Sequence, residues 1–151
     1  MSAVAPAMSP VVGGQDAKAT HISAALNASF DQDFKLYYLQ QAVLRTAGRT
    51  ELAVAVADLS YSFCPSNAYC LVADFVAPKL SVADAQGRTQ VVSLPVLSAP
   101  RNAAWLDTTS IRANGRRYLL YYKSWSVRAG VARPAKTDIS AIFRVTKPAR
   151  N

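Results

Sequence analysis

The sequence predicts an all-β protein, built as a two-sheet sandwich or jelly roll from about eight short strands. Short segments rich in β-branched and aromatic residues recur along the chain, and clusters of Gly, Pro, Asn and Asp separate them. Several segments alternate apolar and polar side chains with the period of two that a half-buried strand requires. At 151 residues, the chain matches one domain that is large enough to bury a core without cross-links.

Residues 1–19 precede the expected strands and are interpreted as a flexible N-terminal arm. They consist mostly of Ala, Ser, Pro, Val and Gly, and Lys18 is their only basic residue. The folded domain is therefore expected over residues 20–151. The N-terminus lacks the basic start and unbroken apolar stretch of a signal peptide, and no apolar run is long enough to span a bilayer. We therefore expect a protein that is not exported by a classical route and has no membrane partner.

Turn and strand signals give the order of the elements. The expected strands cover residues 20–27, 34–41, 51–63, 70–78, 90–97, 108–112, 116–127 and 138–146. Residues 84–88 form a turn between the fourth and fifth of them. Pro95 places the end of the fifth at an edge or a strand terminus. Asn114-Gly115 is the strongest hairpin signal in the chain.

Residues 34–47 allow two interpretations, a strand or a helix. The segment FKLYYLQQ is apolar and aromatic, as in a strand, but Asp31 and Asp33 before it and Gly48 after it are typical helix boundaries. We favour a strand that continues into a short helical turn at residues 42–47.

Two segments raise the question of which face is buried. The apolar residues of 52–56 share one face of a strand, while those of 59–63 fall on the other, so a bulge or burial on both faces is expected. In 116–127, strict alternation places Leu119, Tyr121, Trp125 and Val127 on one face and Tyr118, Leu120 and Tyr122 on the other. Tyr118 and Trp125 could stack on nucleic-acid bases, but packing in the core is the preferred interpretation.

Positive charge is concentrated in the C-terminal third. Residues 101–151 contain eleven Lys and Arg against two acids, whereas residues 1–100 contain six against seven. A folded domain with one strongly basic region indicates a polyanionic partner, most often nucleic acid or a membrane surface, although an ordinary basic surface has the same composition.

The few cysteines and histidines give no support for an enzyme or a metal site. Cys64 and Cys70 could close a disulfide across a hairpin, or remain free thiols, which we favour for a cytosolic protein. Together with the single His21 they do not make a zinc-ligand set. His21 also lies more than forty residues from the nearest thiol in sequence, so we expect no catalytic residues, no metal and no cofactor.

Several local features follow one another in a characteristic order over residues 40–148. They are a segment at 43–48 before a strand, a Pro-containing loop at 64–66 before 74–78, a Val-x-x-Pro strand end at 92–95, a Leu-Asp-Thr-Thr segment at 106–109, a turn at 114–115 before 118–122, and a Pro/Ala-rich loop at 132–136 before the last strand. In this order the chain resembles the coat proteins of tymoviruses and related plant RNA viruses. It departs from them at Phe75 and Lys79, where the family's most recognisable motif has Trp and Asn.

The resemblance implies an eight-stranded jelly roll that self-assembles into an icosahedral shell around single-stranded RNA, in virions assembled in the host cytoplasm. It also implies that basic residues of the folded domain, rather than of the arm, contact the RNA. The candidate RNA-binding residues are Arg45, Arg49, Arg112, Arg116, Arg117, Arg144 and Lys147, with Arg112, Arg116 and Arg117 as the preferred cluster.

Two other functions remain open. A phage decoration or other virion accessory protein would share the β fold and oligomerise but would bind protein rather than RNA. A secreted or periplasmic β-sandwich binding module would be supported by a disulfide between Cys64 and Cys70 and disfavoured by free thiols.

Overall fold

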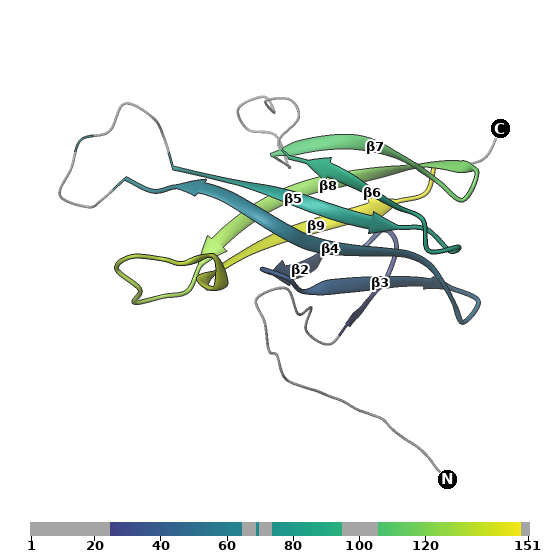
Figure 1. The fold of residues 1–151 in the computed structure, drawn as a ribbon, viewed down its shortest axis with the longest axis horizontal. Coiled ribbons are helices and arrows are strands. Elements are labelled where there is room, and N and C mark those ends of the chain that lie inside the picture. The colour runs from purple at the N-terminus through teal and green to yellow at the C-terminus, as the bar shows by residue number, and fades with distance from the viewer. Residues whose placement is uncertain (1–24, 65–68, 70–73, 95–105, 149–151) are drawn as a thin grey trace, which may run out of the picture.

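The computed structural model describes residues 25–64, 69, 74–94 and 106–148, and the expected arm 1–19 lies outside them. The described residues form nine strands (Figure 1). They are β1 (Leu26–Ala28), β2 (Phe34–Tyr37), β3 (Gln41–Thr46), β4 (Arg49–Ser62), β5 (Phe75–Ala83), β6 (Thr89–Ser93), β7 (Asp107–Ala113), β8 (Arg116–Val127) and β9 (Ile139–Thr146). No helix in this part of the chain is long and apolar enough to cross a membrane.

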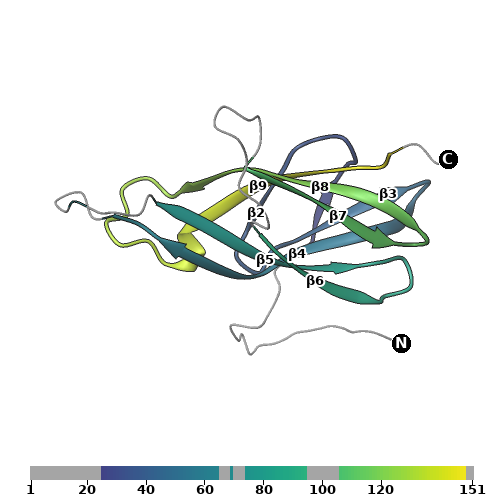
Figure 2. The ribbon, with the colours of Figure 1, turned by 90° about the horizontal axis from the view of Figure 1, so that it is seen from above.

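The strands form two sheets, in the orders β1-β3-β4-β5-β6 and β2-β9-β8-β7. Figure 2 shows the two layers, with β5 and β6 below β8 and β9. The predicted all-β sandwich is confirmed. The jelly-roll connectivity is not confirmed: a jelly roll combines two Greek keys, whereas β3 to β6 and β7 to β9 each follow one another as antiparallel neighbours.

The core lies between the sheets and is filled by alternate residues of both. Its largest fully buried side chains are Tyr118, Tyr122, Phe143, Leu36, Leu44, Leu52, Leu80, Ile111, Leu120, Ile139, Val54 and Val56. Burying each such side chain stabilises the fold by about 1.5–3 kcal/mol. Tyr122 also donates a hydrogen bond across the core to the Val76 carbonyl (2.6 Å), and burial raises the pKa of Tyr122 above its usual value.

The predicted helical turn at residues 42–47 is wrong. This segment is β3, which pairs with β1 in parallel and with β4 in antiparallel orientation. Ala42 and Leu44 are fully buried with the two-residue period of a strand, and pairing on both sides outweighs the local helix propensity of Ala, Leu and Arg. The segment 34–47 therefore consists of two strands, separated by a turn in which Leu39 has a φ of 65°.

Pro78 does not end a strand as the sequence predicts, because β5 continues to Ala83. Proline is tolerated within sheets at bulges, and β4 has a register shift between Val56 and Asp58, directly opposite this part of β5. The same shift confirms the predicted bulge in 51–63, since it lets the apolar residues on both sides of it face the core.

A second bulge corrects the predicted faces of residues 116–127. The register of β8 shifts between Tyr122 and Ser124. This brings Trp125 and Val127 to the same side of β8 as Tyr122, where they pack against the core. Residues 116–127 contain neither Gly nor Pro, one of which often marks a β-bulge.

The expectation of free thiols is also wrong for the residue that the structure describes. Cys64 is disulfide-bonded. The chain has one other cysteine, Cys70, which lies outside the described residues. The Cys64 N–H additionally donates to the Asp74 carboxylate (2.6 Å), so both polar and covalent contacts hold this end of β4.

Two hairpins share the same unusual turn conformation. Asn114 and Gly115 both have positive φ (54° and 69°), which confirms the predicted Asn-Gly hairpin. Ala47 and Gly48 have nearly the same values (55° and 79°). Asn adopts this left-handed conformation readily, but for Ala it is strained, at about 1–2 kcal/mol.

Replacing Ala47 by Asn should therefore stabilise the protein. We expect A47N to raise the free energy of unfolding by about 0.5–1 kcal/mol and the melting temperature by about 2–4 °C. Thermal unfolding followed by circular dichroism measures the change. A129N, at an exposed alanine without positive φ, is the matched control. An A47N variant no more stable than wild type would contradict the strain argument.

Candidate nucleic-acid interface

Three hairpin connections meet at one end of the sandwich, at the right in Figure 1. They are the β3–β4 turn at residues 47–48, the β5–β6 turn at 84–88 and the β7–β8 turn at 114–115. The end of β9 reaches the same place, since Lys147 lines one hollow together with residues of the β5–β6 and β7–β8 turns and with Thr46 and Arg49, which flank the β3–β4 turn. Antiparallel order explains this meeting, because alternate turns of a meander lie at the same end of a sheet.

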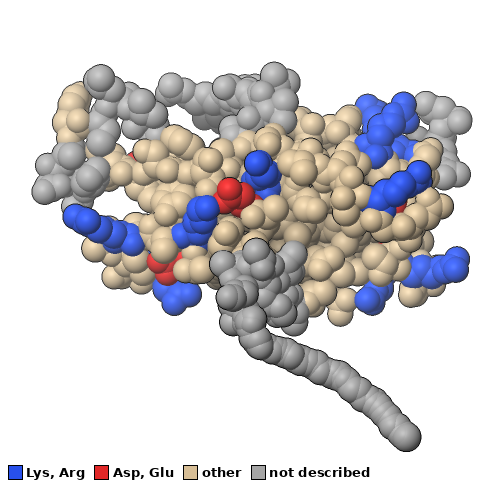
Figure 3. Space-filling view, in the orientation of Figure 1, with Lys and Arg blue, Asp and Glu red and all other residues tan. Residues whose placement is uncertain are grey.

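Basic residues gather at this end, which we call the basic end. They are Arg45, Arg49, Arg88, Arg112, Arg116, Arg117 and Lys147. Figure 3 shows part of this group as blue side chains at the right-hand edge of the molecule. The list contains every predicted RNA-binding residue except Arg144. It adds Arg88, which the sequence presents only as part of a turn and which the topology brings beside the others.

Most of these arginines have no acidic partner within the part of the chain that the structure describes. The salt bridges among the described residues join Arg88 to Asp84, Arg128 to Asp138, Lys136 to Asp58, Arg144 to Asp33 and Lys147 to Glu51. None of them includes Arg45, Arg49, Arg112, Arg116 or Arg117. The basic end therefore presents uncompensated guanidinium groups, which suits it to binding a polyanion.

Two of these arginines are direct neighbours across a pair of strands. Arg112 of β7 lies opposite Arg117 of β8, and both side chains are exposed. Like charges placed directly opposite each other destabilise an antiparallel pair by a few tenths of a kcal/mol. The fold thus tolerates a small loss of stability in order to place two cations side by side.

The Asn114 side chain holds the three turns together. Its Oδ1 accepts a hydrogen bond from the Ala85 N–H (2.8 Å). Its Nδ2 donates to the Glu51 carbonyl (2.8 Å) and to the Tyr118 hydroxyl (3.0 Å). One amide therefore links the β5–β6 turn, the start of β4 and the start of β8, and sets the distances between the arginines on them.

Glu51 is the second centre of this network. Its carboxylate accepts hydrogen bonds from Thr46 (2.6 Å), Tyr118 (2.5 Å) and Lys147 (3.2 Å). Burial opposes ionisation of Glu51, but these three donors outweigh it and hold the pKa of Glu51 below its ordinary value of 4.5. Burial, reinforced by the Glu51 carboxylate, raises the pKa of Tyr118 to about 12, so its hydroxyl remains a donor.

Arg116 is held in place at the base of the same end. Its Nη2 donates to the Pro148 carbonyl (2.7 Å), and its guanidinium lies 5.5 Å from the centre of the Tyr118 ring. Its Nε is buried and has no hydrogen-bond partner among the described residues. A buried donor without a partner costs free energy, which is a second local cost of positioning a cation here.

The remaining sequence candidates lie elsewhere. Arg144 occupies the outer face of the four-stranded sheet, where its Nε donates to Asp33 (2.8 Å). Tyr118 is fully buried, and Trp125 packs against Phe63 with ring centres 5.5 Å apart. The preference for core packing of both aromatic residues is therefore confirmed.

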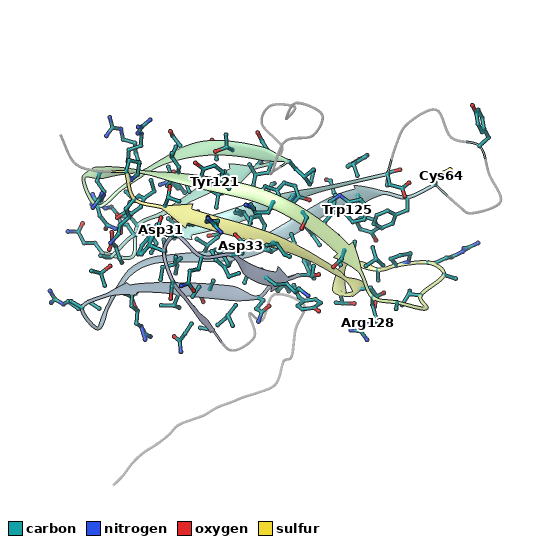
Figure 4. All side chains as sticks on the ribbon, turned by 180° about the vertical axis from the view of Figure 1, so that it is seen from behind. Asp31, Asp33, Cys64, Tyr121, Trp125 and Arg128 are labelled. Carbon is teal, nitrogen blue, oxygen red and sulfur yellow. The ribbon has the colours of Figure 1, made fainter. Side chains whose placement is uncertain are left out.

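The opposite end of the sandwich contains Cys64, Trp125 and Arg128, labelled in Figure 4. Two of its basic residues are in salt bridges: Arg128 lies 3.6 Å from Asp138, and Lys136 lies 2.5 Å from Asp58. Arg133, in the same connection, is exposed and is in no salt bridge among the described residues. The hydrogen bond from Lys136 lowers the pKa of Asp58 below its usual value. Among the described residues, this end therefore has fewer cations than the basic end, and a larger share of them is in salt bridges.

Comparison with known proteins gives no relative from which a function could be transferred. No protein-family model matches the chain, and no curated protein or solved structure matches it either.

The Glu51 network makes a testable contribution to stability. We expect E51Q to lower the free energy of unfolding at pH 7 by about 1.5–3 kcal/mol, because the hydrogen bonds to a charged acceptor are lost. Since the folded-state pKa of Glu51 lies below 4.5, its stabilisation is complete above pH 4.5 and is lost as the pH falls through the folded-state value. Urea unfolding at several pH values measures this.

The difference between wild type and E51Q should accordingly shrink as the medium becomes more acidic. D33N is the control, since Asp33 is in an exposed salt bridge and its replacement should cost less than about 1 kcal/mol. A difference between wild type and E51Q that stays constant from pH 7 to pH 3 would exclude the ionised network as its source.

The neighbouring arginines give a second expectation. R112E replaces a repulsive cross-strand pair with an attractive one, so it should stabilise the protein by about 0.2–1 kcal/mol. The double variant R112E/R117E restores repulsion and should lose that gain. Melting temperatures at low salt test both. A single variant less stable than wild type would show that repulsion between these residues is negligible.

Proposed function

We propose that this protein is a viral coat subunit that self-assembles and packages single-stranded RNA, and that its basic end contacts the RNA. The observation that carries the proposal is the gathering of five arginines at one end of the sandwich, none of them in a salt bridge among the described residues. The sequence resemblance to tymovirus coat proteins supports the same function.

The chemistry of the basic end fits contact with a phosphate backbone. Guanidinium groups bind phosphate oxygens through two parallel hydrogen bonds without distinguishing the bases. A few such contacts per subunit bind weakly, but many subunits on one RNA molecule bind strongly through multiplicity. The binding should therefore be independent of sequence and sensitive to salt.

The outer face of the five-stranded sheet supports contact between copies. The outward side chains of β4, β5 and β6 near Val91 are small and uncharged, and they include Ala53, Ala55, Ser81 and Ala83. Lys79, in the middle of β5, is also outward and exposed. Val91 is 66% exposed, which is high for a large apolar side chain. The small, uncharged patch around Val91 can pack against another copy without opposing the positive charge of the chain.

A second candidate function is supported by the disulfide. Cys64 is disulfide-bonded, and disulfides persist mainly in secreted, periplasmic or virion-surface environments. An exported β-sandwich module would use the basic end to bind an acidic partner. The two functions differ in whether the purified protein is assembled around nucleic acid.

Size-exclusion chromatography with absorbance at 260 and 280 nm tests the proposal. We expect a megadalton peak that is rich in absorbance at 260 nm and loses RNA at high salt. A small, nucleic-acid-free species, unchanged at low salt and high concentration, would exclude the coat function and favour the exported module. Alkylation of the unreduced protein, read by mass spectrometry, separately reports whether Cys64 is oxidised.

Binding of a single-stranded RNA oligonucleotide tests the assigned surface. R112E should weaken binding and reduce the slope of log affinity against log salt by about 0.7, the value for one lost contact with a single strand. K123E makes the same change of charge on β8 but away from the basic end, and should leave the slope unchanged. Equal effects of the two variants would show that net charge alone governs binding.

A further inference from the structure

A hollow of about 640 Å³ lies between the three turns of the basic end. This is within the range of about 300–1,000 Å³ that is typical of ligand pockets. Its charged lining residues are Arg49, Arg88, Arg116, Lys147 and Glu51. The lining thus has four cations against one carboxylate, and it comes from two of the turns, the residues that flank the third, and the end of β9.

The cations of this hollow fall into two groups. Lys147 is tied to Glu51 (3.2 Å) and Arg88 to Asp84 (3.1 Å), so both are partly neutralised. Arg49 and Arg116 have no ion pair among the described residues. The strongest attraction for an anion therefore comes from two guanidinium groups on different hairpins, one from each sheet.

The part of the hollow around Asn114 and Arg116 is held before any ligand arrives, whereas Arg49 is exposed. Asn114 joins the β5–β6 turn to β4 and β8, and Arg116 is anchored to the Pro148 carbonyl. Preorganised donors lose little freedom on binding, so more of their interaction energy appears as affinity. A diffuse basic surface of long, mobile side chains lacks this property.

A second hollow of about 380 Å³ adjoins the first. The two share Arg88, Asn114, Gly115 and Arg116, and the second adds Arg112. Arg116 therefore lies in the wall common to both. The second hollow is also lined by Asp84, so the larger hollow has the greater excess of positive charge.

We propose that the larger hollow is a discrete phosphate-binding site, in which Arg49 and Arg116 grip one phosphate group through their guanidinium forks. Planar guanidinium groups match the oxygen spacing of phosphate, which a scattered positive surface does not. The ligand is a phosphodiester of RNA, an identification that rests on the proposed function, or a free phosphate or nucleotide, which does not. In either case the proposal is more specific than attraction by net charge, because arginines that line the hollow should contribute more to binding than neighbouring arginines of the basic end that do not.

Isothermal titration calorimetry with inorganic phosphate, at constant ionic strength, tests the site in the full-length protein. We expect saturable binding of one phosphate per chain. Removal of one charge-assisted contact, in R49Q or R116Q, should weaken phosphate binding about tenfold or more. The matched controls are R45Q and R117Q, which remove arginines of the same hairpins that do not line the hollow, and these should change phosphate affinity less than about twofold.

The same variants are titrated with a single-stranded RNA oligonucleotide to separate the sources of phosphate. Weakening by R49Q with both ligands supports a site for the RNA backbone. Phosphate binding without RNA binding supports the site for free phosphate and overturns the proposed function. If R49Q and R45Q weaken phosphate binding equally, the discrete site is overturned. The proposed function is not overturned by that result. R49Q lies on an exposed turn, so it remains informative if R116Q fails to fold.

Discussion

The geometry of the basic end depends on one side-chain amide. Asn114 occupies a left-handed position that few residues tolerate, and its three hydrogen bonds connect elements of both sheets. Glycine would adopt the positive φ of this position, and several polar residues could hydrogen-bond to one of the three partners. Asn adopts the positive φ and also bonds to all three partners. Because Arg116 follows two residues later, and the Ala85 and Glu51 segments are tied to the same amide, the distances between cations on three hairpins follow from this residue.

The two ends of the molecule differ in the number of their cations and in how many of these are paired. At the disulfide end Arg128 and Lys136 are in salt bridges with acids, and Arg133 is in none among the described residues. At the basic end Arg112 and Arg117 repel each other and a donor of Arg116 remains unpaired. Such costs are small beside the burial energy of the core, so the fold can carry them where a binding surface requires them. The gathering of unpaired arginines at one end, rather than the net charge alone, is the physical basis for assigning a function to that end.

Local signals in the sequence predicted much of the fold, and long-range contacts decided the rest. The Asn114-Gly115 turn and the bulge in 51–63 follow from positive φ and from alternation, which are local properties. Residues 42–47 have good helix formers, and only pairing with β1 and β4 makes them a strand. The bulge that turns Trp125 inward has no local marker. Most residues of the basic end could be predicted because charge is visible in the sequence. Only the topology showed that Arg88 belongs to this end and that Arg144 does not.

Because successive hairpin connections alternate between the two ends of the sandwich, the molecule has two separate sets of loops. β8 has 12 residues and spans about 40 Å, so the connection after it lies far from the arginine group. Gly130 in that connection is exposed and has a φ of 81°, in a turn outside both sheets. A peptide epitope or affinity tag grafted beside Gly130 would project from the end of the sandwich opposite the basic end. The loops of either end could then be changed while those of the other end keep their structure.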